Sequence, residues 1–230
     1  MEKALDCDLL RARLVEQIRA AGIHDERVLE AIGSVPRHVF LPGFPSEAAY
    51  EDRPLPIEGG QTISQPYIVA LMIQAAQITP ADRVLEIGTG SGYGAAVMSR
   101  IAREVFSVER LEPLADGARA RLVELGFENV QVRCGDGTLG WQEHAPYDAI
   151  VVTAGGPGVP ESLRKQLAVG GRLVIPVGEA PSFQTLVRVT RQAEDRYRYE
   201  EIEYVRFVAL IGAEGWDEVT DTPPRAADGA

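Results

Sequence analysis

The sequence Val-Leu-Glu-Ile-Gly-Thr-Gly-Ser-Gly-Tyr-Gly occupies residues 84–94 and decides the fold. Its first four residues predict a short buried strand, which runs into a glycine-rich turn and then into a helix over residues 95–101. Glycine has no side chain, so backbone N–H groups in such a turn can approach a bound molecule closely. The stretch therefore predicts the ligand-binding turn of an α/β fold.

The spacing of the glycines narrows the class of ligand. Glycines stand at positions 88, 90, 92 and 94. A Walker phosphate loop ends in Gly-Lys-Ser/Thr and a dinucleotide site has the pattern Gly-x-Gly-x-x-Gly, and neither pattern is present. Glu86 precedes the turn, where a carboxylate would repel phosphate and attract a cation. S-adenosylmethionine carries an ammonium and a sulfonium group, and we expect it to be the cofactor.

Two further acidic residues follow strands of the same sheet. The apolar run over residues 105–108 ends in Glu109, at the offset where a carboxylate accepts hydrogen bonds from ribose hydroxyls. Asp136 follows the strand expected over residues 129–133. Because the carboxyl ends of parallel strands face one crevice, we expect both side chains on the same side as the glycine turn.

Composition limits the classes of partner. The net charge is −11 over 230 residues, and no basic stretch is present, which disfavours a nucleic-acid substrate. The longest apolar stretch, residues 68–76, is too short to span a bilayer, and no signal peptide is evident. We therefore expect a cytoplasmic monomer. Cys7 and Cys134 should be reduced, and the histidines lack ligand spacing, so we expect no metal.

Strands and helices alternate along the chain, which predicts a doubly wound, mostly parallel α/β sheet. Two β-patterned stretches with no helix between them, residues 184–191 and 198–210, predict an antiparallel pair at the sheet edge. Helices over residues 8–21 and 25–33 and a proline-rich loop over residues 35–65 should cover the sheet. The loop carries apolar anchors, so we expect it to be ordered. The expected division of the chain is residues 1–65 for the helices and covering loop, 66–212 for the cofactor-binding domain, and 213–230 for a disordered tail.

The chain resembles the protein-L-isoaspartate (D-aspartate) O-methyltransferase family over residues 9–216. The most specific block is Ala49-Tyr50-Glu51-Asp52-Arg53-Pro54-Leu55-Pro56-Ile57, followed by Gln61-Thr62-Ile63-Ser64-Gln65-Pro66. Residues 37–42, 84–94, 135–137, 147–154, 171–178 and 205–208 also match the family in order. The resemblance implies a class I, Rossmann-like methyltransferase that repairs damaged proteins. It would transfer a methyl group from S-adenosylmethionine to the free carboxylate of L-isoaspartyl residues, with D-aspartyl residues as a further candidate acceptor.

The resemblance also implies a role for individual residues. Ser64, which by its position alone would be a helix cap, is expected at the active site against the substrate carboxylate. Val208 and Ile211 are expected beside the substrate. The implied cofactor-binding residues are Ile63, Gln65, Glu86, Gly88, Gly90, Gly92, Glu109, Arg110, Asp136 and Gly137. A carboxylate is already ionised at neutral pH, so the reaction needs positioning and water exclusion rather than a general base.

Two positions depart from the family pattern. Glu58 stands where the family usually has glycine, and Ala209 where proline is common. A carboxylate that pointed into the site would repel an anionic acceptor, so we expect Glu58 to face solvent.

Other functions stay open at this point. The same fold could methylate a normal aspartate of a modified peptide or another carboxylate, and the sequence alone cannot separate these acceptors. A non-catalytic regulatory protein that binds S-adenosylmethionine would have no need of Ser64. A nicotinamide oxidoreductase is disfavoured by the glycine spacing.

Overall fold

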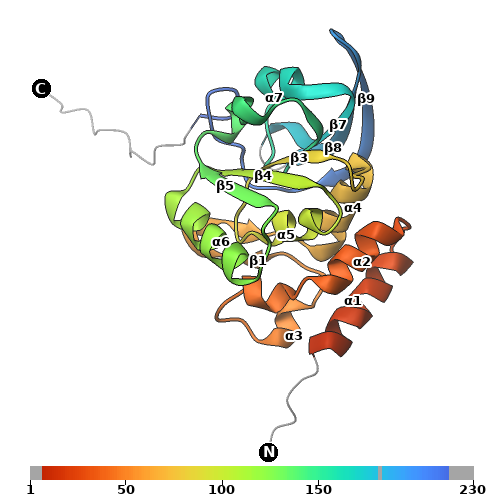
Figure 1. The fold of residues 1–230 in the computed structure, drawn as a ribbon, viewed down its shortest axis with the longest axis vertical. Helices are drawn as coiled ribbons and strands as arrows, with labels where there is room; N and C mark the ends of the chain where they lie inside the picture. The colour runs from red at the N-terminus through yellow and green to blue at the C-terminus, as the bar shows by residue number, and fades with distance from the viewer. Residues whose placement is uncertain (1–6, 181–182, 218–230) are drawn as a thin grey trace, which may run out of the picture.

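A seven-stranded sheet forms the centre of the computed structural model, which describes residues 7–180 and 183–217 (Figure 1). The strand order is β5-β4-β3-β6-β7-β8-β9. The first five strands in this order are parallel, and β8 runs antiparallel to both of its neighbours, which confirms the expected sheet and its antiparallel edge. The strands are β3 (Arg83–Ile87), β4 (Glu104–Glu109), β5 (Val130–Cys134), β6 (Tyr147–Val152), β7 (Leu167–Ala180), β8 (Phe183–Ala193) and β9 (Arg196–Val205).

Helices cover both faces of the sheet. Alternate side chains of each strand point to opposite faces, so Val84 joins one apolar core and Leu85 the other. The larger core packs against α4, α5 and α6, with α1 and α2 outside them, and the smaller core packs against α7 (Figure 1). The helices are α1 (Cys7–Ala20), α2 (Glu26–Ser34), α3 (Ser46–Ala49), α4 (Pro66–Ala76), α5 (Tyr93–Ser99), α6 (Glu112–Glu124) and α7 (Glu161–Gln166).

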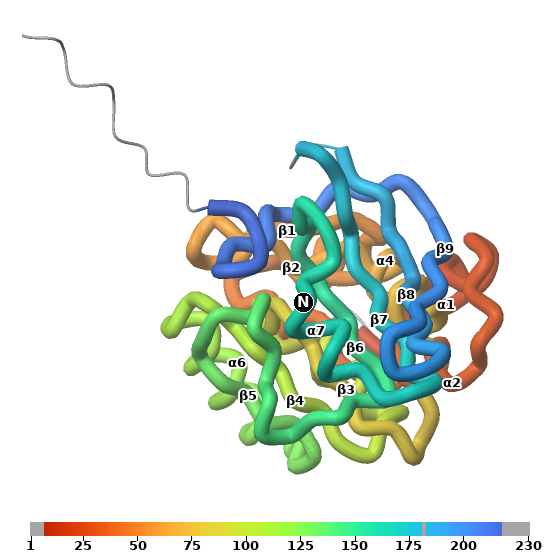
Figure 2. The backbone as a smooth tube through the Cα atoms, turned by 90° about the horizontal axis from the view of Figure 1, so that it is seen from above, coloured from red at the N-terminus to blue at the C-terminus, as the bar shows by residue number. Residues whose placement is uncertain are grey.

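The proline-rich segment over residues 35–65 is ordered, as expected. Between two short helical turns, η1 (Arg37–Phe40) and η2 (Glu58–Gly60), it contains α3 and the strand β1 (Leu55–Pro56). Strand β1 pairs with β2 (Thr62–Ile63) outside the main sheet. Apolar side chains such as Phe40 anchor the segment in the larger core, and Ile57 lies beside Gly90 of the glycine turn. The strands β1 and β2 of this segment are labelled in Figure 2.

Two local predictions are wrong. Ser64 does not cap α4: the N-cap is Gln65, which has no side-chain cap bond, because proline at the first helical position already lacks the N–H that needs a partner. The last strand was expected to reach Leu210 but ends at Val205. The Gln184 side chain there hydrogen-bonds both the N–H and the carbonyl of Phe207, and the chain turns toward the end of β6.

The fold continues past the expected boundary at residue 212. Ala213 N donates to Asp136 Oδ2 at 2.7 Å, and Trp216 Nε1 donates to the Gly155 carbonyl at 2.9 Å. Residues 213–217 therefore pack against the loops after β5 and β6, while the rest of the expected tail lies outside the described residues. No helix in the described ranges has both the length and the apolar character needed to cross a membrane.

Candidate active site

The glycine turn after β3 has a conformation that requires glycine. Gly88, Gly90 and Gly92 have φ angles of 95°, 53° and 91°, in the left-handed region. A Cβ atom at Gly88 would lie 2.3 Å from Thr153 Oγ1. The Thr153 hydroxyl shares its hydrogen bond between the carbonyls of Ile87 (3.0 Å) and Gly88 (2.7 Å), so the loop after β6 holds the turn in place.

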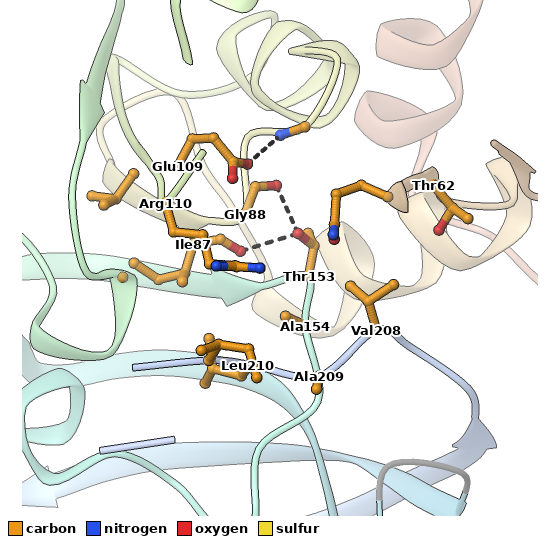
Figure 3. A pocket seen from close by; sticks show the side chains of 15 residues that line it. Thr62, Ile87, Gly88, Glu109, Arg110, Thr153, Ala154, Val208, Ala209 and Leu210 are labelled. Atoms are coloured by element: carbon orange, nitrogen blue, oxygen red, sulfur yellow. Dashed lines mark hydrogen bonds between the residues drawn. The ribbon is translucent and has the colours of Figure 1, made fainter. Parts of the chain in front are cut away.

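A cavity opens beside this turn, where β4 and β6 flank β3 on opposite sides (Figure 3). It contains about 540 Å³ of space, part of it open to solvent. In an α/β sheet this switch point is where ligands bind. The predicted site residues that line the cavity are Gly88, Gly90, Glu109, Arg110, Gly137, Val208 and Ile211.

Glu109 connects the end of β4 to the turn. Its side chain is only 6% exposed and points toward the turn (Figure 3). One carboxylate oxygen accepts from Gly90 N at 2.9 Å and the other from Leu111 N at 3.0 Å. Each oxygen keeps a second acceptor position, so Glu109 can fix the turn and still accept from a ligand hydroxyl. Arg110 is exposed at the cavity rim.

Asp136 and Gly137 follow β5 and have different roles in the free structure. Gly137 borders the cavity, and a Cβ atom there would lie 2.4 Å from Ile87 Cγ2. The Asp136 carboxylate accepts from the backbone N–H and hydroxyl of Thr138 (2.8 and 2.7 Å) and from Ala213 N. Asp136 therefore joins the loop after β5 to the segment after Ile211.

Glu86 is buried beneath the turn. It lies on β3 opposite Ser107 of β4 and is 1% exposed. The Ser107 hydroxyl donates to Glu86 Oε2 at 2.5 Å and lies 2.5 Å from the Thr89 hydroxyl. Burial raises the pKa of Glu86 to about 8; the Ser107 hydrogen bond opposes this shift and the Glu109 charge adds to it. At pH 7 the side chain is therefore mostly a neutral carboxylic acid.

Ser64 follows β2 and borders two spaces. One is a small cavity that it shares with Ile63, Glu86 and the glycine turn, and the other is a groove lined by Gln65, Tyr67 and residues 203–207. Arg37 fixes the main chain here: its guanidinium donates to the carbonyls of Ser64 and Ala49, each at 2.9 Å. Arg37 is fully buried, and its guanidinium carbon lies 4.7 Å from the centre of the Tyr93 ring.

Some predicted residues lie away from the cavity. Gly92 packs against Ala118 and Leu122 of α6, and its φ of 91° disfavours any other residue, so its requirement is structural. Gln65 hydrogen-bonds Asp52 at 3.0 Å and belongs to the groove.

Glu58 is exposed, as expected, and borders a separate apolar cavity behind the turn. Across residues 7–180 and 183–217, no cluster of three or more histidine, cysteine, aspartate or glutamate side chains could hold a metal ion.

Sequence reasoning missed three residues that the structure places at the site. Thr62 borders the cofactor-sized cavity, the small cavity and the groove, and Thr153 closes the turn. Arg37 acts from outside, through the main chain of Ser64. The position of Thr153 directly after a strand at the ligand edge was a usable signal. A buried arginine that bonds two distant carbonyls has no signal in a single sequence.

The residues present fit S-adenosylmethionine. Gly88, Gly90 and Gly137 line the cavity at the strand ends, and the Glu109 carboxylate beside them keeps acceptor positions that suit ribose hydroxyls. The turn lacks the lysine that a phosphate loop uses. Fold and cavity together define a Rossmann-like methyltransferase that uses S-adenosylmethionine.

Sequence comparison then gives the family. The family model for protein-L-isoaspartate(D-aspartate) O-methyltransferase (PCMT) matches residues 10–215. Protein-L-isoaspartate O-methyltransferase 2 of Pelobacter propionicus is 65% identical over 201 residues, which cover 87% of this chain and 89% of the relative. The corresponding protein of Protochlamydia amoebophila is 58% identical and covers 90% of this chain and 99% of the relative. The chain belongs to the protein-L-isoaspartate O-methyltransferase family, whose members are S-adenosylmethionine-dependent enzymes.

Solved structures agree with this assignment. A protein-L-isoaspartate O-methyltransferase superimposes with a TM-score of 0.82 at 34% identity, covering 89% of this chain and 67% of that one. A putative member from Plasmodium falciparum, solved in complex with S-adenosyl-L-homocysteine, has a TM-score of 0.76 at 25% identity and covers 87% of this chain and 98% of that one.

Proposed function

We propose that Ser64 orients the carboxylate of an isoaspartyl residue for methylation, in the reaction that defines this family. The observation that carries this proposal is the position of Ser64 between two spaces. It borders the groove beside β9 and the small cavity under the glycine turn. Thr62 borders both as well, so the groove and the cofactor region meet at residues 62–64.

S-adenosylmethionine supplies an electrophilic methyl group when it is bound. Gly88 and Gly90 would hold its methionine part, Glu109 its ribose, and Gly137 the adenine end. Ile63 would contact it from the small cavity and Arg110 from the rim. Asp136 would act through the loop that it fixes, since its carboxylate already accepts three hydrogen bonds. Gln65 lies on the acceptor side, and Val208 and Ile211, which line the proposed cofactor cavity, would contact the substrate from there.

The protein's own work in this reaction is positioning. The Ser64 hydroxyl has no hydrogen-bond partner within the described residues, so it is free to donate to an acceptor oxygen. The acceptor carboxylate is ionised at neutral pH, and no side chain has to remove a proton. A displacement of about 1 Å can lower a rate of this kind roughly a hundredfold, which explains why buried Arg37 holds the Ser64 main chain.

Acceptor choice follows from covalent geometry. In an isoaspartyl residue the free carboxylate is attached directly to Cα, so the peptide main chain must come closer to Ser64 than with a normal aspartate. The groove between Tyr67 and residues 203–207 runs along the sheet edge up to Ser64 and can admit an extended chain. Arg206 and Glu203 both line this groove, so its charge is mixed and acceptor choice depends on geometry. Damaged proteins and peptides with isoaspartyl residues are the substrates this geometry suits.

The test is methyl transfer from labelled S-adenosylmethionine to three matched peptides, which carry L-isoaspartate, D-aspartate or normal L-aspartate at one position. Selective labelling of the isoaspartyl peptide is the expected result, and the D-aspartyl peptide measures the second candidate acceptor. Equal labelling of the normal peptide would indicate a different carboxylate substrate. Labelling of none, with S-adenosylhomocysteine still bound, would contradict the proposed reaction and favour a regulatory role.

A further inference from the structure

Glu86 has a property that methyl transfer itself does not explain. A carboxyl group with 1% exposure is costly to ionise unless a cation or several donors compensate it. Glu86 has the Ser107 hydroxyl as donor, and the nearest charged group acting on it is another carboxylate, Glu109. Yet it borders the small cavity under the glycine turn, which shares Thr62, Gly88, Gly90 and Thr153 with the lining of the cavity proposed for the cofactor.

We propose that Glu86 is protonated in the free protein and releases this proton to solvent when the ammonium group of the cofactor's methionine part binds beside it. The O–H bond of the carboxylic acid breaks, the ammonium group keeps its own protons, and a buried ion pair forms. The inference rests on the proposed cofactor site, where Glu86 is already expected to contact the cofactor, and adds the release of its proton on binding.

The direction of the Glu86 side chain assigns the ammonium group rather than the sulfonium. The reacting methyl group must face Ser64 and the groove. Glu86 instead points toward α5: a Cβ atom at Gly94 would lie 2.4 Å from Glu86 Oε1, and Oε2 is bonded to Ser107. The amino-acid end of the ligand, beyond the sulfur, is the part that can reach this side. A ligand carboxylate there would be repelled once Glu86 had ionised.

Among residues 7–180 and 183–217, no cation acts on the Glu86 carboxyl group to keep it ionised in the free protein. From β4 it faces Ser107 and the Glu109 carboxylate. From α5 the Tyr93 hydroxyl shares the cavity, with its pKa raised to about 12 by burial, so it is neutral. The Arg37 guanidinium lies over the Tyr93 ring, 4.7 Å from its centre, and is not among the groups that act on Glu86. From α4 and β6 the neighbours are apolar, Val69 in the cavity wall and Val151 in register on the sheet.

The test is isothermal titration of the full chain with S-adenosylhomocysteine at pH 6.5, in two buffers of different ionisation enthalpy. At this pH the ligand's amino group is already protonated, so proton exchange reports on the protein. We expect release of about one proton per ligand bound. The dissociation constant should fall roughly tenfold per pH unit below pH 7 and level off near pH 8. S-adenosylmethionine should release the same proton.

Two controls separate Glu86 from other sources of protons. Methylthioadenosine has the adenosine and sulfur but no amino-acid part, so it should bind with release of less than about 0.2 proton. The isosteric variant Glu86→Gln should bind S-adenosylhomocysteine with no release and no pH dependence below pH 8. Equal release with methylthioadenosine, or undiminished release in Glu86→Gln, would overturn the assignment. Tight binding of S-adenosylhomocysteine to the native chain without any release would refute the role of Glu86 and leave the cofactor site intact.

Discussion

Substitution of Arg37 by lysine tests whether a buried side chain outside the cavity sets the position of Ser64. Arg37 is fully buried and donates from two nitrogens to the carbonyls of Ala49 and Ser64, each at 2.9 Å. A lysine ammonium is a single point donor and can reach one of these carbonyls at a time. The variant keeps the charge, loses one charge-assisted hydrogen bond and leaves one buried carbonyl without a partner.

The loss of that bond sets the expected size of the effect. A hydrogen bond to a charged group contributes about 1.5–3 kcal/mol, so the free energy of unfolding should fall by about 2 kcal/mol. For a chain of this length each kcal/mol changes the Tm by about 2–4 °C, which gives a decrease of about 6 °C. A shift of the Ser64 main chain should lower kcat with an isoaspartyl peptide by about tenfold or more. The dissociation constant of S-adenosylhomocysteine should stay within about twofold, because Arg37 contacts the site through the Tyr93 ring and the Ser64 carbonyl, which lie outside the lining of the proposed cofactor cavity.

The assays are thermal unfolding, steady-state methylation of an isoaspartyl peptide, and calorimetric binding of S-adenosylhomocysteine. Arg53→Lys is the matched control, because Arg53 lies in the same segment and its ion pair with Glu51 is half-exposed. It should change stability by less than about 0.5 kcal/mol. An Arg37→Lys variant with unchanged Tm and kcat would refute the positioning role. A parallel loss of cofactor affinity would show instead that Arg37 acts through Tyr93.

Three further changes test other parts of the site. Ser64→Ala should lower kcat with isoaspartyl peptide about tenfold or more and leave S-adenosylhomocysteine affinity within about twofold; equal losses in both would exclude an acceptor role. Glu109→Ala should weaken S-adenosylhomocysteine binding by about tenfold or more in calorimetry, and unchanged affinity would exclude ribose binding. The folded-state pKa of Glu86 is raised from 4.5 to about 8, so its stabilising contribution is complete below pH 4.5 and is lost as the pH rises to 8. Between pH 5 and 8, the free energy of unfolding of the native chain should therefore fall by a few kcal/mol relative to that of Glu86→Gln, as measured by thermal unfolding without ligand. If the free energies of the two proteins changed in parallel with pH, the buried neutral acid would be contradicted.

The local pattern of the sequence was sufficient to predict most of the fold. The glycine turn and the alternation of strands and helices predicted the parallel sheet, and the two β-patterned stretches after residue 183 predicted its antiparallel edge. These features depend on neighbours in the chain, such as apolar runs bounded by glycine. The end of β9 was not predictable in this way, because the Gln184 side chain, over twenty positions earlier in the sequence, takes the hydrogen bonds of Phe207 that a partner strand would otherwise make.

The predicted cofactor-binding residues reach the cavity where they follow strand ends. Gly88, Glu109 and Gly137 all reach one cavity because the parallel sheet brings the carboxyl ends of β3, β4 and β5 to one edge. Gly92 matched the same sequence pattern but faces α6 instead. The sequence pattern indicates that glycine is needed at position 92. Only the tertiary contacts show whether a ligand or a helix is the reason.

The sequence by itself determined the sheet, the ligand edge and the family of this protein, since these follow from residue type and spacing along the chain. Only the tertiary structure decided the state of Glu86 and the role of Arg37. Glu86 is acidic in any sequence reading, but its burial against Ser107 and Glu109 raises its pKa to about 8 and makes it a neutral acid. Arg37 is a positive charge in the sequence, and it becomes the support of Ser64 because folding brings residues 37, 49 and 64 within hydrogen-bond distance. Both effects come from desolvation and from contacts between distant segments, which local sequence does not contain.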